Sequence, residues 1–266
     1  CWKAGGNSNT YNIDGKGYAT AAAAGLDGGT IDPTGASINT KSGFSIITYN
    51  GNGTAGATIA HGLGIKPAWI ICKSRSTESD WRVYHQTLGN TSALKLNTQE
   101  QAASSTTYWN DTSPTSTTVS FGTETDLNGS GRTHVMYCWA EIPGYSKFGK
   151  YKGSGDAEGK HVYCGFKPAW VMIKKVSSSG TSWAIQDTTR DTINPTAYNT
   201  LAADSNSAEP QSGAGTFEGN FIDFVSDGFV LKSNAGTTNA ENQSHVYMAF
   251  AEQPGTTAFA THSNAR

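Results

Sequence analysis

Residues 64–73 read Gly-Ile-Lys-Pro-Ala-Trp-Ile-Ile-Cys-Lys, and residues 165–174 read Gly-Phe-Lys-Pro-Ala-Trp-Val-Met-Ile-Lys, an offset of 165 − 64 = 101. A second pair follows in the same order. Residues 134–144 read His-Val-Met-Tyr-Cys-Trp-Ala-Glu-Ile-Pro-Gly, and residues 245–255 read His-Val-Tyr-Met-Ala-Phe-Ala-Glu-Gln-Pro-Gly, an offset of 245 − 134 = 111. Two motifs that recur in one order at nearly one spacing indicate a duplicated unit of the size of a small domain. The period exceeds the roughly 20–50 residues of solenoid and propeller repeats.

The stretches around these motifs carry short runs typical of β-strands. Phe44–Tyr49 is β-branched and aromatic and ends at the turn sequence Asn-Gly-Asn-Gly, and similar runs recur between frequent turn residues. No long window shows a helical stripe of apolar residues. The pattern predicts an all-β protein of two tandem β-sandwich or jelly-roll-like lobes. The expected strands are residues 44–49, 68–73, 81–85, 94–96, 118–121, 133–140, 147–151, 160–163, 169–174, 183–186, 221–225, 228–232 and 245–251.

The domain organisation follows from the repeat and from the turn-rich start of the chain. Residues 1–42 are rich in Gly, Ala, Asn and Thr, which predicts an extended connector with at most short strands. Residues 43–145 and 146–255 are the two β repeats, and residues 256–266 are a polar tail. Cys1-Trp2-Lys3 resembles Cys138-Trp139-Ala140, so we expect residue 1 to lie in the last strand of a preceding, similar unit.

Composition narrows the functional classes. Only 15% of the residues are charged and 31 are glycine, so solubility rests on hydroxyl and amide groups, a bias that suits an extracellular or virion surface. The net charge is −2 without a basic run, which leaves no electrostatic footprint for nucleic acid. No apolar window reaches the roughly 18 residues of a spanning helix, so no membrane insertion is expected.

The four cysteines give no sign of a metal or redox site. Cys1, Cys72, Cys138 and Cys164 show no Cys-x-x-Cys spacing, so neither zinc nor a redox pair is indicated. Cys72 and Cys138 align with apolar residues of the second copy, which favours buried free thiols. We expect no metal and no cofactor.

The motif strands are apolar on both faces. Alternation places Val135, Tyr137 and Trp139 on one face and Met136 and Cys138 on the other. A two-sheet sandwich leaves one face of each sheet in water, so these strands need a second cover. The partner lobe, the connector or another subunit can supply it, and a homo-oligomer, for example a trimer, is one source.

No motif indicates an enzyme. His134 and Glu141, like His245 and Glu252, are seven apart, so a regular strand points them to opposite faces. The carboxylates show no pairing of the kind that glycoside hydrolysis needs, and the nucleophile-elbow, zinc-helix and phosphate-loop motifs are absent. The repeated Lys-Pro-Ala-Trp is read as a folding element, because an identical element in both copies indicates a shared folding requirement. These observations predict a protein without catalytic residues.

The best candidate for recognition is a loop with adjacent aromatics. Tyr108, Trp109, Asn110 and Asp111 lie between expected strands, and the second copy offers only Tyr198 and Asn199 at a similar place. Aromatic rings can stack on sugar rings while amide and carboxylate groups bind hydroxyls, and loops on a rigid scaffold often carry function. The alternative is that Trp109 folds back to cap the lobe.

The motif pair also resembles a repeat family in tail-fibre-like proteins of tailed bacteriophages, especially marine ones. The resemblance rests on Gly-Phe-Ser-Ile at residues 43–46 and on both repeated motifs, and it covers nearly the whole chain. It implies an oligomeric, virion-associated fibre or adhesin. We therefore expect attachment to a cell-surface glycan, with other copies of the chain or other virion proteins as partners. A purely structural fibre, capsid-decoration or surface-layer module and a glycan depolymerase are the alternatives.

Overall fold

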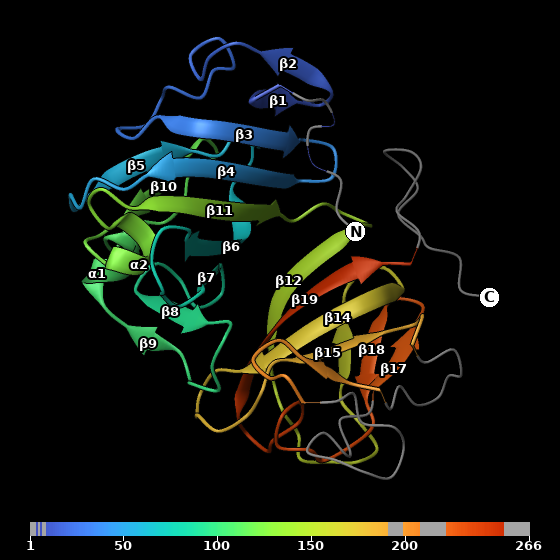
Figure 1. Ribbon diagram of the computed structural model, residues 1–266. Helices are drawn as coiled ribbons and strands as arrows, with labels where there is room; N and C mark the ends of the chain where they lie inside the picture. The colour runs from blue at the N-terminus through green and yellow to red at the C-terminus, as the bar shows by residue number, and fades with distance from the viewer. Residues whose placement is uncertain (1–3, 5, 7–8, 191–198, 208–221, 253–266) are drawn as a thin grey trace. The chain divides into compact units, whose positions relative to one another are not determined.

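The computed structural model describes residues 4, 6, 9–190, 199–207 and 222–252 and confirms an all-β protein (Figure 1). The chain divides into two compact units, and each contains two sheets. We call residues Cys1–Lys95 and Ala103–Glu141 unit 1, and residues Leu96–Ala102 and Ile142–Arg266 unit 2. No sheet within the described residues closes into a barrel. Each expected strand that lies within the described residues is present, with ends that differ by at most a few residues.

Unit 1 is built on a nine-stranded sheet in the order β2-β1-β3-β4-β11-β6-β7-β8-β9, with a smaller sheet of β10 and β5. Two short helices, α1 and α2, lie in its connections. The elements are β1 (Tyr11–Ile13), β2 (Lys16–Tyr18), β3 (Pro33–Asn39), β4 (Phe44–Asn50), β5 (Ala57–Ala60), β6 (Pro67–Ser74), β7 (Arg82–His85), β8 (Ser92–Lys95), β9 (Ala103–Ser104), α1 (Thr106–Trp109), β10 (Thr118–Phe121), α2 (Thr125–Asn128) and β11 (Thr133–Ala140).

Unit 2 repeats this plan with fewer strands. Its main sheet has the order β12-β19-β14-β15-β16, and its smaller sheet has the order β13-β18-β17. The elements are β12 (Ser146–Lys152), β13 (His161–Tyr163), β14 (Pro168–Lys175), β15 (Ala184–Asp187), β16 (Leu201–Ala202), β17 (Ile222–Val225), β18 (Gly228–Leu231) and β19 (Ser244–Ala251).

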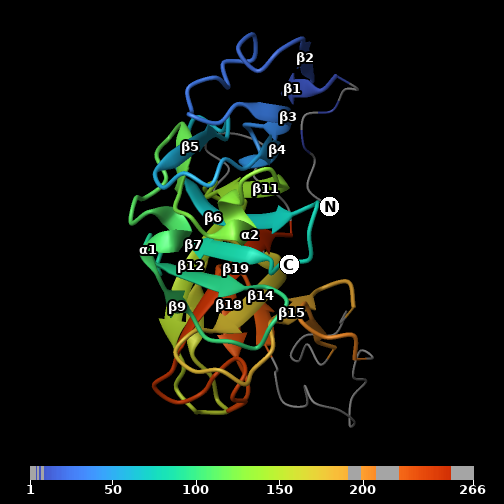
Figure 2. The ribbon, with the colours of Figure 1, turned by 60° about the vertical axis from the view of Figure 1, so that its left-hand side comes forward.

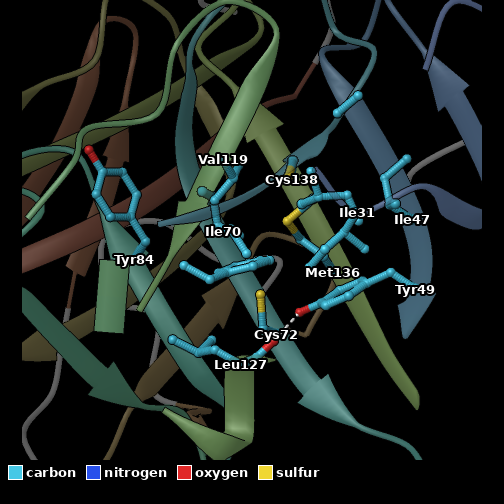
Figure 3. Packing of buried hydrophobic residues seen from close by; sticks show 14 of the residues in the cluster. Ile31, Ile47, Tyr49, Ile70, Cys72, Tyr84, Val119, Leu127, Met136 and Cys138 are labelled. Atoms are coloured by element: carbon cyan, nitrogen blue, oxygen red, sulfur yellow. Dashed lines mark hydrogen bonds between the residues drawn. The ribbon is translucent and has the colours of Figure 1, made fainter. Parts of the chain in front are cut away.

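The two repeated motifs form neighbouring central strands in each unit. β6 pairs antiparallel with β11, and β14 pairs antiparallel with β19. In unit 1, one face of this strand pair enters the core between the two sheets, where Ile70, Cys72, Met136 and Cys138 are buried (Figure 3). Burial raises the pKa of both thiols, as expected for cysteines that act as small apolar residues. The motif therefore recurs because it builds the centre of each sheet.

Each unit has the same set of buried polar contacts between its strands and its connecting segments, made by a tyrosine, a histidine and an asparagine. Tyr49 donates a hydrogen bond to the Leu127 carbonyl at 2.6 Å, and its ring stacks on His134 at 5.1 Å. Tyr151 does the same with the Thr238 carbonyl at 2.6 Å and with His245 at 5.0 Å. The offsets are 151 − 49 = 102 and 245 − 134 = 111.

The asparagine completes this arrangement. Asn128 is fully buried, and its amide donates to the Thr54 carbonyl at 3.0 Å and the Gly122 carbonyl at 3.2 Å. Asn239 donates to the Asp156 carbonyl at 2.9 Å and the Ser233 carbonyl at 2.7 Å. Buried polar groups of this kind specify one loop geometry because each must find its partner. The duplication therefore extends beyond the motifs to a shared polar framework.

The expected connector over residues 1–42 is instead largely part of unit 1, and the structure corrects this interpretation. β3 is seven residues long and pairs along β4, with β1 parallel on its far side (Figures 1 and 2). Ile31 bridges to Ile59 of β5. Leu26, Ile31 and Ile38 are buried in the core. We call residues 10–39 the cap, because they cover the outer edges of both β4 and β5.

The sequence did not indicate the strands of the cap, because many residues of the cap are small. A Cβ at Gly29 would lie 2.6 Å from the Thr58 carbonyl oxygen, so only glycine allows this close approach to β5. β3 itself reads Pro-Thr-Gly-Ala-Ser-Ile-Asn, which has little of the bulky alternation that marks a strand. Its place in the sheet is set by pairing with β4 and by tertiary packing rather than by intrinsic propensity.

The second face of the motif strands is also apolar and buried. Trp69 is fully buried and Trp139 is 5% exposed, and the Trp139 ring stacks on Phe44 at 4.9 Å. In unit 2, Phe250 occupies this face with Phe148 at 6.0 Å. This agrees with the prediction of strands that are apolar on both sides.

One segment between β8 and β9 belongs to unit 2. This segment, Leu96–Ala102, lies alongside the loop after β14. The Gly180 amide donates to the Gln99 carbonyl at 3.0 Å, and the Ala102 amide donates to the Val176 carbonyl at 3.1 Å. Lys174 is fully buried and donates to the Thr181 carbonyl at 2.9 Å. Burial lowers the pKa of Lys174 to about 8.

Candidate functional site

The predicted recognition loop folds as a single helical turn. Ser105 precedes α1 with an extended backbone, and its hydroxyl accepts a hydrogen bond from the Thr107 amide at 3.1 Å, the arrangement of a helix N-cap. The turn ends at Asn110, whose φ of 51° is in the left-handed region that asparagine tolerates. This turn determines where the two aromatic side chains point.

Both aromatic rings of the loop are directed into unit 1. Trp109 is fully buried, and its indole N–H donates to the Ser92 carbonyl at 3.0 Å. Its ring meets Tyr84 edge-on at 5.5 Å. Tyr108 is 8% exposed and belongs to the same core. The alternative in which Trp109 folds back on the lobe is therefore the one observed, and its ring is not free to stack on a sugar.

The polar half of the predicted site remains near the surface. Asp111 is exposed, and its carbonyl accepts a hydrogen bond from the Asn90 side-chain amide. Asn110 is half-buried. In the second copy, Asn199 is half-buried, and Tyr198 lies outside the described residues. Among the described residues predicted for ligand binding, Asn110, Asp111 and Asn199 thus retain accessible side chains.

A charged cluster lies directly beside α1. Arg82, on β7, is buried, and its Nε donates to Asp126 of α2 at 3.0 Å. Its Nη2 lies 3.8 Å from a Glu124 carboxylate oxygen and 3.9 Å from one of Asp80. Lys95 pairs with Asp80 at 2.9 Å. We call these residues, together with Tyr108, the Arg82 cluster.

Tyr108 links the cluster to the predicted loop. The Arg82 guanidinium lies over the Tyr108 ring, 5.0 Å from its centroid, a cation–π arrangement. Burial lowers the pKa of Arg82, whereas the carboxylates of Glu124 and Asp126 raise it. The effect of the carboxylates is the larger in sum, so the pKa lies above its usual value. A permanently charged guanidinium thus holds the surrounding carboxylates in place.

The outer members of the cluster are accessible. The side chains of Asp80, Lys95 and Glu124 are 26%, 22% and 22% exposed, whereas that of Arg82 is 9% exposed. The cluster therefore presents two carboxylates and an ammonium group that are held in position before any ligand arrives. Such preorganisation reduces the entropy lost when polar groups bind a partner.

The cluster exists in only one of the two copies. The position of Arg82 is taken by Ala184, with the offset 184 − 82 = 102, and that of Asp126 by Thr237, with the offset 237 − 126 = 111. Sequence reasoning missed Arg82, Lys95 and Glu124. A residue-by-residue comparison of the copies contains the signal, because an arginine at a core-facing strand position stands against an alanine.

The other candidate groups have structural roles. His134 is fully buried against Tyr49, and burial lowers its pKa. Glu141 accepts a hydrogen bond from Gln86 at 3.3 Å, and its counterpart Glu252 pairs with Lys167 at 2.8 Å. In the part of the chain that the structure describes, no three His, Cys, Asp or Glu side chains form a group that could hold a metal ion.

No described helix is long and apolar enough to cross a membrane. No curated protein and no solved structure matches this chain. A family described as a domain of unknown function, DUF7483, matches residues 1–254. The match includes all of unit 1 with the cap, and unit 2 as far as residue 254, so the chain belongs to the DUF7483 family.

Proposed function

We propose that this protein is a segment of a virion-associated tail fibre or adhesin that attaches to a host-surface glycan. One observation carries the proposal: the Arg82 cluster, which is preorganised and partly exposed, occurs in the first copy of the duplicated framework and not in the second. Function belongs to sites rather than to folds. A charged group that the shared framework does not require is therefore the best candidate for a site.

The chemistry of the cluster suits sugar hydroxyls. The carboxylates of Asp80 and Glu124 accept hydrogen bonds, and the Lys95 ammonium donates them. Asp111, two positions beyond the end of α1, has a further exposed carboxylate. Because both aromatic rings of the loop are buried, the loop offers no stacking platform for a sugar, and we expect weak single-site binding. Several copies on one particle compensate through avidity, which agrees with a homo-oligomer.

A purely structural role is the second candidate. It is favoured by the burial of Tyr108 and Trp109, because α1 then serves to pack the core of unit 1. Under this alternative, the Arg82 cluster only fastens β7 to α2, and the protein is a fibre, capsid-decoration or surface-layer module without a ligand. A glycan depolymerase is the third candidate.

One assay separates the three classes. The purified chain is applied to an array of bacterial surface polysaccharides and is also incubated with them in solution while reducing ends are measured. The proposal predicts saturable binding without release of reducing ends. Release of reducing ends would identify a depolymerase, and absence of binding across the array would favour the structural module.

A further inference from the structure

The two units differ in how their sheet edges are covered. In unit 1, the cap covers the outer edges of β4 and β5. In unit 2, β12 and β13 take the places of β4 and β5, since Tyr151 pairs with His245 as Tyr49 pairs with His134. Each is the outermost strand of its sheet, and no described strand pairs with its far side. Within the described residues, this side of unit 2 thus has no counterpart of the cap, and we call it the open side.

The backbone of β12 has hydrogen-bonding groups directed to this open side. Gly153 donates to the Gln243 carbonyl, on the side of β19. Because alternate residues of an antiparallel strand point their N–H and C=O groups to opposite sides, those of Lys150 and Lys152 point away from β19. The equivalent positions in unit 1 are Thr48 and Asn50, and Thr48 lies opposite Gly35 of β3.

The side chains along the open side are basic where those of unit 1 are neutral. Thr48, Asn50 and Thr58 become Lys150, Lys152 and Lys160 at the common offset of 102. In unit 1, the hydroxyls of Thr48 and Thr58 bond to the cap: Thr34 lies 3.0 Å from Thr48, and the Thr30 amide donates to Thr58 at 3.1 Å. All three lysines are exposed. Lys150 and Lys160 therefore occur at positions whose counterparts in unit 1 meet the cap.

A single extended segment can reach both edges. In unit 1, Ile31 bridges to β5 and Pro33 pairs with Tyr49 of β4, so the two contacts are only two positions apart along the chain. Two residues span at most about 7 Å, and each strand pairing adds about 5 Å. The two edges are thus about 17 Å apart or less in unit 1, and the common strand pairing gives unit 2 a similar spacing.

We propose that the open side of unit 2, lined by Lys150, Lys152 and Lys160, binds an extended acidic segment of a partner protein. The segment adds antiparallel to β12, as β3 adds to β4. Main-chain hydrogen bonds supply the part of the affinity that does not depend on the sequence of the segment. Lys150 and Lys152 lie two residues apart on one face of β12, so the matching segment has carboxylates at alternate positions.

Charge selects this occupant over a second copy of the same edge. Pairing β12 with β12 of another copy would set lysine against lysine, and lysines on an exposed edge discourage such self-pairing. Asp156 and Glu158 lie in the loop between β12 and β13, and Glu158 lies 3.9 Å from Lys232. We therefore expect the carboxylates of the partner to lie opposite β12 rather than opposite the acidic loop between β12 and β13. This surface is distinct from the Arg82 cluster and does not depend on it.

The test uses the full chain and a fluorescent peptide with Glu at alternate positions and Thr or Val between them. A control peptide has the same composition with all Glu residues grouped at one end. Anisotropy titration should show saturable binding of the alternating peptide, weakened about tenfold or more in Lys150→Glu/Lys152→Glu, since two attractive pairs become repulsive. The matched variant Lys41→Glu/Lys66→Glu, with the same charge change on unit 1, should bind as wild type does.

Three outcomes would overturn the proposal. The first is no saturable binding up to about 1 mM peptide, the weakest affinity of interest. The second is equal binding of the two peptides or of the two double variants. The third is a wild-type protein that binds no peptide while Lys150→Thr/Lys152→Asn self-associates in light scattering. That last result would mean that the lysines only protect the edge from self-pairing.

Discussion

Tyr49 and Tyr151 show how single side chains hold each unit in one geometry. Each hydroxyl is buried and donates to a backbone carbonyl of the segment that precedes the last motif strand, Leu127 of α2 in unit 1 and Thr238 in unit 2. Each ring also stacks on the buried histidine of that strand. The interaction bridges residues 78 and 87 positions apart in the two copies, so it closes the loop onto the sheet.

Removing either hydroxyl should destabilise the protein. Tyr49→Phe and Tyr151→Phe each leave a buried carbonyl without its donor, and we expect a loss of about 1–3 kcal/mol in the free energy of unfolding. Urea denaturation followed by fluorescence measures it. Tyr163→Phe is the control, because Tyr163 is 64% exposed, and it should change stability by less than about 0.5 kcal/mol. Equal effects at all three positions would contradict the assigned roles.

Trp109 should behave as a core residue rather than as a ligand contact. Trp109→Ala removes a fully buried indole and its hydrogen bond to Ser92, so we expect a loss of about 3–5 kcal/mol of stability. The exposed neighbour Ser116 provides the control, and Ser116→Ala should be nearly neutral. A stable Trp109→Ala protein that merely lost glycan binding would show that the ring acts at the surface.

Two buried histidines should make stability depend on pH. Burial lowers the pKa of His61 and of His245 from 6.5 to about 4. Between these pH values the unfolded chain binds more protons than the folded one, so stability is full above about pH 6.5 and falls as the pH drops towards 4. Urea titrations at several pH values should show this slope, reduced in His61→Gln/His245→Gln. An identical slope in the double variant would assign the dependence to other groups.

At the scale of elements, the motif strands were predictable and the cap was not. Phe44–Asn50 and Thr133–Ala140 have bulky, β-branched and aromatic residues that alone indicate strands. β3 has small residues, and its strand conformation depends on β4, which no local pattern reveals. The same applies to Trp109, because a four-residue turn decides whether its ring faces the core or the solvent. Arg82 was missed because Asp126, to which its guanidinium donates a hydrogen bond, lies 44 positions away along the chain.

The cap should therefore be required for the stability of unit 1. Ile38→Ala leaves a cavity at a fully buried position, and we expect a loss of about 2–5 kcal/mol in the free energy of unfolding. A flexible connector would instead tolerate the change. Lys41→Ala, at an exposed position just beyond β3, is the matched control and should be nearly neutral.

At the scale of the whole molecule, the duplication separates a shared framework from features that occur in one copy alone. Both copies keep the motif strands and the polar framework of tyrosine, histidine and asparagine. The copies differ at the Arg82 cluster and at the covered or open side of the sheets. We therefore expect recognition where the copies diverge, on a scaffold formed by the shared parts.

The most direct measurement compares glycan binding by the wild-type chain and two variants with equal changes in charge. Asp80→Asn/Glu124→Gln removes the accessible carboxylates of the Arg82 cluster, and Glu78→Gln/Glu241→Gln removes two exposed carboxylates elsewhere. All three proteins are first shown to unfold cooperatively and are then titrated with the polysaccharide that the array identifies. We expect at least about a tenfold loss of affinity, or about 1.4 kcal/mol, in the first variant and none in the second. Unchanged binding by a folded Asp80→Asn/Glu124→Gln protein would contradict this expectation.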